Sequence, residues 1–225
     1  MNIEQFTPVV VPLEQVSDLW EENDVVIFIV DMTDYPSPDA NYLSEAEKVY
    51  LDTLKTDHFR NRYITSRIVL KSLSGYLKKR SWSDMVTYKD EKGRVHVCDH
   101  NDLHVCISYS GNILALALSK TEVGIDIEFI RPRSVASISK SIDRTLSDSN
   151  PSAHVYDFLS RWTLKEAYCK ISNETMFSNL SRKLDLSGLY HSSHCMENKY
   201  LLAIVTRSLP GKVKVVCLQK IDLSS

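Results

Sequence analysis

The sequence lacks several features that mark particular classes of protein. Of its 225 residues only 6 are glycine and 7 are proline, which excludes a collagen-like repeat. Its longest strongly apolar run is Val25–Val30. A membrane span needs about 20 apolar residues. We therefore expect neither a fibrous protein nor one that associates with a membrane.

The sequence also lacks a surplus of positive charge. Lysine and arginine number 27 against 29 aspartates and glutamates, and the formal net charge is −2. Nonspecific binding of nucleic acid requires a basic excess. We therefore expect no nucleic-acid partner.

Neither a secretion signal nor a paired-cysteine motif is evident. The first twenty residues contain Glu4, Glu14 and Asp18 and no basic residue, unlike a signal peptide. The 5 cysteines form no C-x-x-C pair, and an odd number is typical of free thiols in a reducing compartment. These observations favour a cytoplasmic protein.

What is present is typical of a globular protein. Hydrophobic residues make up 43% of the chain and charged residues 25%. The length suffices for one large domain or two small ones. A strand, then helices, then a sheet are expected in each half, without a residue-level repeat. We therefore expect an N-terminal half over residues 1–119 and a C-terminal half over 120–225.

Apolar periodicity and capping signals predict the elements of the first half. Ser44 followed by Glu47 three residues later is a capping box, typical of a helix N-terminus. The turn-forming residues 110–112 separate two apolar segments and indicate a hairpin. The predicted elements are a buried strand over residues 24–31, helices over 44–55 and 57–80, and hairpin strands over 103–109 and 113–119.

The second half is predicted to alternate strands and helices in the same way. Asn150 and Pro151 suit the N-cap and the first position of a helix. Pro210 and Gly211 indicate a turn. The predicted elements are a strand over residues 123–130, a weak helix over 134–146, a helix over 150–171, and strands over 200–207 and 212–219.

Two carboxylates interrupt the predicted strand over residues 123–130. Because side chains alternate along a strand, Asp126 and Glu128 lie on one face together with Gly124. At ~3.3 Å per residue the two carboxylates are about 7 Å apart along the strand, a spacing that suits a hard cation such as Mg²⁺. The alternative is a half-exposed strand with a solvated acidic face.

Two further charges continue an apolar helical stripe. The stripe formed by Val155, Phe158, Leu159 and Trp162 extends, at helical spacing, to Lys165 and Glu166. Charged side chains are seldom buried unless they are paired or bind something. The alternative is an amphipathic helix whose last turns enter solvent, with Glu166 and Lys170 forming an ordinary salt bridge.

Taken together, three carboxylates and neighbouring lysines fit a Mg²⁺ site that handles phosphates. Phosphoryl transfer needs a metal to neutralise the anion, cations to hold oxygens and a base to accept a proton. A metal-dependent nuclease would also use strand carboxylates, but it is expected to have a lysine where Ile130 stands. A zinc site is disfavoured because no metal-binding spacing frames the cluster of His96, Cys98, His100, His104 and Cys106.

These motifs resemble a known family. The segment Gly124–Glu128, followed by Trp162-x-x-Lys165-Glu166-Ala167-x-x-Lys170, resembles the signature pair of the 4′-phosphopantetheinyl transferases. Residues 105–111 are similar to that family's serine–histidine–serine–glycine strand end, with Tyr109 in place of the histidine. Residues 93–95 are similar to its glycine–lysine–proline, with Arg94 in place of the lysine.

The resemblance implies a fold and a reaction. The length is similar to the larger type that activates synthetases such as the surfactin one. That type implies an α+β fold in which two similar α/β halves form an intramolecular pseudo-dimer, a monomer with the active site between its halves. The implied reaction moves 4′-phosphopantetheine from coenzyme A to a serine of an apo acyl or peptidyl carrier protein and releases 3′,5′-ADP. Carriers of fatty acid, polyketide, nonribosomal peptide and lysine biosynthesis are all compatible with it.

The resemblance also implies residue roles. Asp126, Glu128 and Glu166 would bind Mg²⁺, and Glu166, directly or through a water, would take the serine proton. Lys170, with Lys165 as a second candidate, would neutralise the pyrophosphate. Residues expected to contact coenzyme A are Arg62, Arg94, Ser108, Tyr109 and, in the first helix, Lys48. The alternatives are a noncatalytic homologue that binds coenzyme A or carrier protein, and a Mg²⁺-dependent phosphohydrolase.

Overall fold

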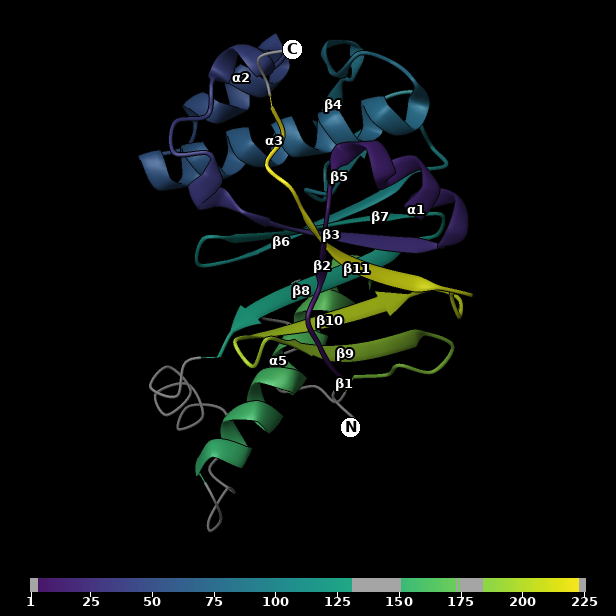
Figure 1. Ribbon diagram of the computed structural model, residues 1–225. Helices are drawn as coiled ribbons and strands as arrows, with labels where there is room; N and C mark the ends of the chain where they lie inside the picture. Colours follow the sequence, from purple (N-terminus) through teal and green to yellow (C-terminus); the bar gives the residue numbers. More distant parts are fainter. Residues whose placement is uncertain (1–3, 131–150, 173, 175–183, 223–225) are drawn as a thin grey trace. The chain divides into compact units, whose positions relative to one another are not determined.

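The computed structural model describes residues 4–130, 151–172, 174 and 184–222, with side chains described from residue 156 in the second range (Figure 1). The fold is mixed α+β, as expected. The chain divides into two compact units, each built from discontinuous segments. The first combines residues 1–7, 108–111 and 122–209, and the second combines residues 8–107, 112–121 and 210–225.

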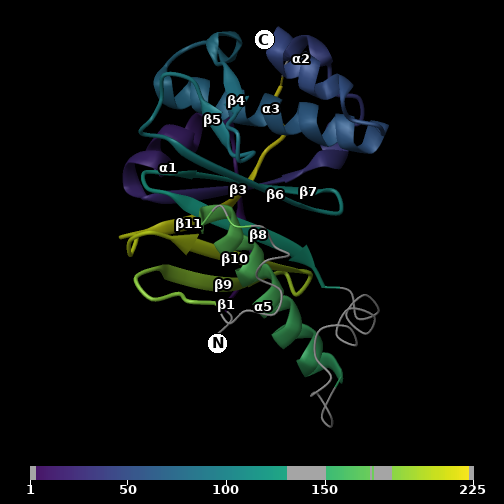
Figure 2. The same ribbon diagram turned by 180° about the vertical axis from the view of Figure 1, so that it is seen from behind.

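Among its described residues, the first unit contains a four-stranded sheet covered by one long helix. β10 pairs antiparallel with both β8 and β9, and β1 pairs parallel with β9. Figures 1 and 2 show α5 lying against this sheet. The elements are β1 (Glu4–Phe6), β8 (Val123–Phe129), α5 (Pro151–Ser172), β9 (Tyr190–Met196) and β10 (Tyr200–Thr206), with the strand order β1-β9-β10-β8.

The described residues confirm the predictions for β8, α5 and β10 within about one residue at each described end. Strands β1 and β9 were not predicted, because their polar residues hide the strand pattern. The weak helix expected over residues 134–146, the N-cap Asn150 and the side chain of Val155 lie outside the described residues.

The core of this unit forms where α5 packs on the sheet. Leu164, Ala167 and Ile171 of the helix contact Ala203 and Val205 of β10. The predicted stripe is confirmed in part, because Leu159 and Phe158 pack with Cys195 and Leu201 of the sheet. It fails further along the helix. Trp162, Lys165 and Glu166 are only half-buried, because the smaller side chains beside them face the sheet and let the helix approach it.

The second unit contains a five-stranded mixed sheet. β11 pairs parallel with both β2 and β3, and β3 pairs antiparallel with β7. The hairpin of β6 and β7 is confirmed, and Gly111 at its turn has a φ of 59°. The strands are β2 (Val9–Val11), β3 (Val25–Asp31), β6 (His104–Ser110), β7 (Ile113–Ser119) and β11 (Val213–Leu218), in the order β2-β11-β3-β7-β6.

The two C-terminal strands, expected at residues 200–207 and 212–219, lie in different sheets as β10 and β11. Asp24 explains why β11 joins β3: its carboxylate accepts the N–H of Gly211 at 2.6 Å, and its backbone N–H donates to the Lys212 carbonyl at 3.0 Å. These bonds fix the start of β11 beside the start of β3.

Three helices accompany the second sheet, and the predicted helices at 44–55 and 57–80 are confirmed as α2 and α3. The predicted capping box is present, since Glu47 accepts the N–H of Ser44 at 2.8 Å and donates its own to the serine hydroxyl at 3.4 Å. The remaining elements are α1 (Val16–Glu22), α2 (Glu45–Asp52), α3 (Asp57–Lys78), β4 (Thr87–Lys89), β5 (Val95–Val97) and short 3-10 turns at Leu13–Gln15, Met32–Asp34, Ala40–Tyr42 and Trp82–Asp84.

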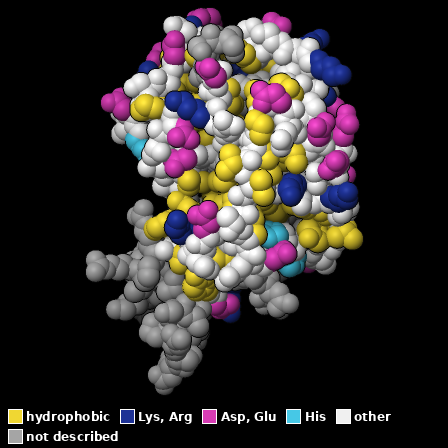
Figure 3. Space-filling view, viewed as in Figure 1, with side chains coloured by type: hydrophobic (Ala, Val, Ile, Leu, Met, Phe, Trp, Pro, Cys, Tyr) yellow, Lys and Arg dark blue, Asp and Glu magenta, His cyan; other side chains and the backbone are white. Residues whose placement is uncertain are grey.

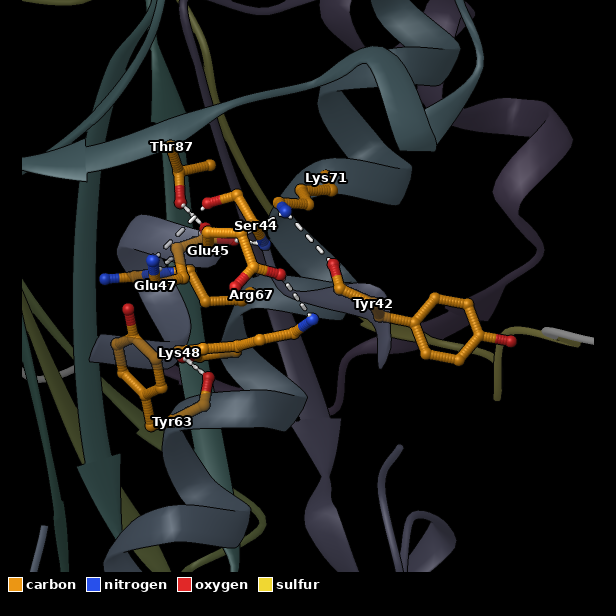
Figure 4. Close-up of polar contacts among 10 residues, drawn as sticks. Tyr42, Ser44, Glu45, Glu47, Lys48, Tyr63, Arg67, Lys71 and Thr87 are labelled. Carbon is orange, nitrogen blue, oxygen red and sulfur yellow. Dashed lines mark hydrogen bonds and ion pairs between the residues drawn. The ribbon is translucent and has the colours of Figure 1, made fainter. Parts of the chain in front are cut away.

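Glu47 is also the centre of a buried ionic cluster that joins α2, α3 and β4 (Figure 4). Lys71 Nζ lies 2.6 Å from one carboxylate oxygen, and Arg67 Nε lies 3.8 Å from the other. Thr87 donates its hydroxyl to the same carboxylate. Because Glu47 is only 3% exposed, this capping residue holds three elements together.

The surface and the helices of the described residues can be compared with the expectations about membranes, charge and cysteines. No helix among the described residues combines the length and apolar character that crossing a bilayer requires. On the face shown in Figure 3, acidic and basic side chains of the described residues are interspersed, in keeping with the net charge of −2. None of the 5 cysteines, all within the described ranges, forms a disulfide.

Candidate metal centre

Strand β8 places two carboxylates on the face that α5 covers. Gly124, Asp126 and Glu128 alternate with apolar residues, so they share one side of the strand. Asp126 is only 2% exposed, and Glu128 is half-buried. The alternative of a half-exposed strand with a solvated acidic face is therefore wrong.

The helix brings a third carboxylate to the same place. Single ligand atoms of Asp126, Glu128 and Glu166 all lie within 4.8 Å of one another. Among the described residues, no other group of three or more potential metal ligands converges in this way. The histidines and cysteines between residues 96 and 106 therefore do not form a metal site there. The three residues predicted to bind Mg²⁺ are thus brought together by two elements remote in sequence.

The electrostatics of the group favour a cation. Burial, and secondly the nearby Asp126 carboxylate, raise the pKa of Glu166 to about 7. The same two causes raise the pKa of Glu128. Hydrogen bonds from Ser110 and Trp162 lower that pKa and so offset part of the rise. Three carboxylates so close together repel one another unless protons or a positive ion neutralise them.

Lys170 supplies one positive charge to this group. Its Nζ lies 2.9 Å from Asp126 Oδ1 and donates to the Ile125 carbonyl, also at 2.9 Å. The alternative of an ordinary salt bridge between Glu166 and Lys170 along the helix is not what the structure shows, because Lys170 forms its ion pair with Asp126 of the strand. Its charge also lowers the pKa of Glu166. The lysine therefore ties α5 to β8 at the carboxylates.

The residues fit a divalent cation. Asp126 Oδ2 is buried and has no hydrogen-bond partner among the described residues. A buried carboxylate oxygen is costly to leave without a partner. Hard cations such as Mg²⁺ prefer oxygen ligands of this kind. The orphaned oxygen and its two carboxylate neighbours together form a suitable donor set.

Two serines of β6 also contact the carboxylates. Ser108 Oγ donates to Asp126 Oδ1 at 2.6 Å, and Ser110 Oγ donates to Glu128 Oε2 at 3.3 Å. Both serines belong to the first unit although they end a strand of the second sheet. Ser108 was predicted from the sequence to contact coenzyme A, whereas no role was predicted for Ser110.

The structure places the other predicted coenzyme A contacts in both units. Tyr109 and Lys165 are half-buried and belong to the first unit. The remaining three belong to the second: Lys48 pairs with Glu45 at 2.8 Å, Arg62 Nη1 lies 3.5 Å from His58 Nε2, and the Arg94 N–H donates to Asp90 at 2.9 Å. The roles of these five residues stay predictions.

Two residues contribute to the site in ways that sequence reasoning missed. Trp162 was expected to serve in packing, but its hydrogen bond to Glu128 is among the causes that lower that group's pKa. Ser110 could have been found from its spacing, because Ser108 and Ser110 repeat the two-residue separation of Asp126 and Glu128.

Known proteins match the segment that carries this site. Residues 122–200, which contain the three carboxylates and Lys170, match the model of the 4′-phosphopantetheinyl transferase superfamily. The chain is similar to the 4′-phosphopantetheinyl transferase AcpT of Escherichia coli O157:H7 and to that of Escherichia coli K12, with 32% identity over 127 residues in each case. Each match covers 52% of this chain and 63% of the relative. The resemblance carried by the two acidic motifs is thereby confirmed: residues 122–200 match the 4′-phosphopantetheinyl transferase superfamily, and the chain spans less than two thirds of the length of the curated relatives it matches.

Proposed function

We propose that this chain transfers the 4′-phosphopantetheine group from coenzyme A to a serine of an apo acyl or peptidyl carrier protein. The observation that carries the proposal is the convergence of Asp126, Glu128 and Glu166 within 4.8 Å, inside the segment that matches the superfamily. The 32% identity to two transferases of this kind supports the same activity.

The three carboxylates are the proposed ligands of a divalent cation such as Mg²⁺. Such an ion, when bound, supplies positive charge that stabilises the pyrophosphate of coenzyme A as it reacts. The orphaned Asp126 Oδ2 supports this assignment, because it is a buried acceptor that no protein donor satisfies in the described part of the chain.

Glu166 is the proposed general base. A serine hydroxyl is a poor nucleophile at neutral pH, so a carboxylate that accepts its proton assists the attack. The serine oxygen forms a bond to the phosphorus that carries pantetheine, the bond from that phosphorus to 3′,5′-ADP breaks, and the hydroxyl proton passes to Glu166. A base is most effective when its pKa lies near the working pH, and that of Glu166 is raised to about 7.

The remaining roles follow the family resemblance. Lys170, with Lys165 beside it, is proposed to neutralise the pyrophosphate. We also propose the larger, pseudo-dimeric type, acting as a monomer in the cytoplasm. The proposed contacts of coenzyme A are Lys48, Arg62, Arg94, Ser108 and Tyr109.

Incubation with coenzyme A, MgCl₂ and a panel of apo carrier domains tests the activity, with intact-mass spectrometry of each carrier as the readout. A mass gain of one phosphopantetheine arm, abolished by EDTA, supports the transferase. Retained coenzyme A binding with no gain on any carrier indicates a noncatalytic homologue instead. Breakdown of coenzyme A in the absence of carrier indicates a phosphohydrolase.

A further inference from the structure

Strand β8 is an edge strand of its sheet, whose strand order is β1-β9-β10-β8. One side of β8 therefore has no neighbouring strand among the described residues of this sheet. The N–H groups along a buried strand edge need acceptors from elsewhere. Two serine hydroxyls provide them: Ser108 Oγ accepts the Ile127 N–H at 3.3 Å, and Ser110 Oγ accepts the Phe129 N–H at 2.8 Å.

Each of these hydroxyls also donates its proton to a carboxylate. A serine hydroxyl has one proton to donate, so a hydroxyl that accepts an amide N–H can direct its proton to a second group. Ser108 directs it to Asp126, and Ser110 directs it to Glu128. The same relay therefore occurs twice, two residues apart on both strands.

The relay determines which carboxylate oxygen of Asp126 is satisfied by the protein. Asp126 Oδ1 accepts from both Ser108, at 2.6 Å, and Lys170, at 2.9 Å. Asp126 Oδ2 is left buried without a hydrogen-bond partner among the described residues. The protein thus holds one oxygen of this side chain and leaves the other without a donor among the described residues.

We propose that Ser110 is a positioning residue of the metal centre, which holds Glu128 through the relay from the Phe129 amide, as Ser108 holds Asp126. This inference rests on the proposed function, because it assigns the carboxylates to a cation. Hydrogen bonds to ligating carboxylates orient them before the metal arrives, and loss of such a partner typically weakens metal affinity ~10–100-fold.

Ser110 tests the relay more cleanly than Ser108. Ser108 shares its acceptor oxygen with Lys170, so that oxygen keeps a donor when the serine is removed. Ser108 is also a proposed contact of coenzyme A, so its replacement would affect two functions at once. Ser110 is not a proposed contact of coenzyme A, and the second donor to its partner Glu128 is the neutral side chain of Trp162 rather than a charged lysine. Ser110 is 7% exposed.

The experiment is calorimetric titration of the full-length chain with Mg²⁺ or Mn²⁺ in the absence of coenzyme A. Ser110→Ala removes the relay, Ser110→Cys keeps the size but offers only a weak donor, and Ser110→Thr retains the hydroxyl. Ser193→Ala is the control, because Ser193 is a buried serine two strands away from β8 in the same sheet. Circular dichroism checks that each variant folds.

We expect a dissociation constant at least ~10-fold weaker for Ser110→Ala and Ser110→Cys, with Ser110→Thr and Ser193→Ala close to wild type. In the Glu128→Gln background, Ser110→Ala should cause no additional loss, because its partner is already changed. Wild-type affinity in folded Ser110→Ala or Ser110→Cys overturns the positioning role while leaving the proposed function intact. Absence of metal binding in the wild-type chain overturns both.

Discussion

A Cβ atom on Gly124 would overlap the carbonyl oxygen of Ala167, so the backbones of β8 and α5 meet at this glycine. The same Cβ would also lie 3.1 Å from the Ile171 nitrogen. Asp126 follows Gly124 by two residues, and Glu166 precedes Ala167 by one. The glycine therefore sets the separation of the two elements that carry the carboxylates.

Gly124→Ala should displace α5 from the sheet. Forcing a methyl group into a packed interface typically costs about 1–3 kcal/mol, and here it must move backbone atoms rather than a side chain. We expect a loss of stability in urea denaturation of that order or more, together with weaker Mg²⁺ binding by calorimetry.

Gly93→Ala is the matched control for this variant. Gly93 has a φ of 84° and open space around its Cβ position, so alanine there introduces backbone strain without a clash. It should lower stability and leave metal binding unchanged. Equal effects of the two substitutions on Mg²⁺ affinity would contradict the positioning role of Gly124.

Lys170→Met should destabilise the first unit, because it leaves the buried Asp126 carboxylate without its cation. Breaking a buried pair costs about 3–5 kcal/mol. Since the Lys170 side chain is 30% exposed, we expect a loss near ~2–3 kcal/mol in urea denaturation without metal. A large excess of Mg²⁺ should recover part of this loss, because the ion replaces the missing charge.

Arg161→Met on the same helix is the comparison. Arg161 pairs with Asp157 at 2.6 Å, but its side chain is 66% exposed, and pairs of this kind contribute only ~0–1 kcal/mol. A cost for Lys170→Met no larger than that of Arg161→Met would show that the lysine does not compensate Asp126.

Glu47→Gln should have a large effect in the second unit. The carboxylate is buried and pairs with Arg67 and Lys71, and its removal leaves two buried cations without their anion, at a cost of about 3–5 kcal/mol. Glu45→Gln removes an exposed partner of Lys48 from the same helix and should cost less than ~1 kcal/mol. Denaturation curves of both variants decide this, and similar stabilities would refute the structural role of the cluster.

Stabilisation by Mg²⁺ should increase with pH. The pKa of Glu166 is raised from 4.5 to about 7, so the stability associated with its protonated form is complete below 4.5 and is lost as pH rises through about 7. Above that pH a bound cation relieves the repulsion, whereas below it the cation competes with a proton. The gain in melting temperature on adding Mg²⁺ should therefore be larger at about pH 8 than at about pH 5.

Glu166→Gln tests the origin of this pH dependence. The variant cannot ionise at this position, so the metal-free protein should lose less stability between about pH 5 and about pH 8. A profile identical to that of the wild type would assign the pH dependence to another group.

The sequence was most informative where one local signal determined one element. The capping box at Ser44 and Glu47 predicted the start of α2, and the alternation through Asp126 predicted β8. Motif spacing also grouped the three acids correctly, because two elements that pack together bring their motifs into contact. The capping box and the strand alternation each depend on a few neighbouring residues, and the grouping of the acids depends on a known pair of motifs.

The parts that the sequence did not predict depend on contacts remote in the chain. Helical spacing offered Glu166 as an alternative partner for Lys170, but where the backbones approach at Gly124 the lysine contacts Asp126 and the Ile125 carbonyl. Strand β9 contains two histidines and two serines, so only its pairing with β10 reveals it. The second role of Glu47, as a buried ion partner, depends on Lys71 and Thr87, 24 and 40 residues away.

The most direct test of the central claim is single-turnover transfer to an apo carrier by Glu166→Gln, followed by intact-mass spectrometry. With coenzyme A and saturating Mg²⁺, the wild-type chain should add one phosphopantetheine arm. The variant should react at least ~10²–10⁴-fold more slowly, while retaining its fold and its affinity for coenzyme A. Transfer by the folded variant at the wild-type rate would contradict the assignment of Glu166 as the base.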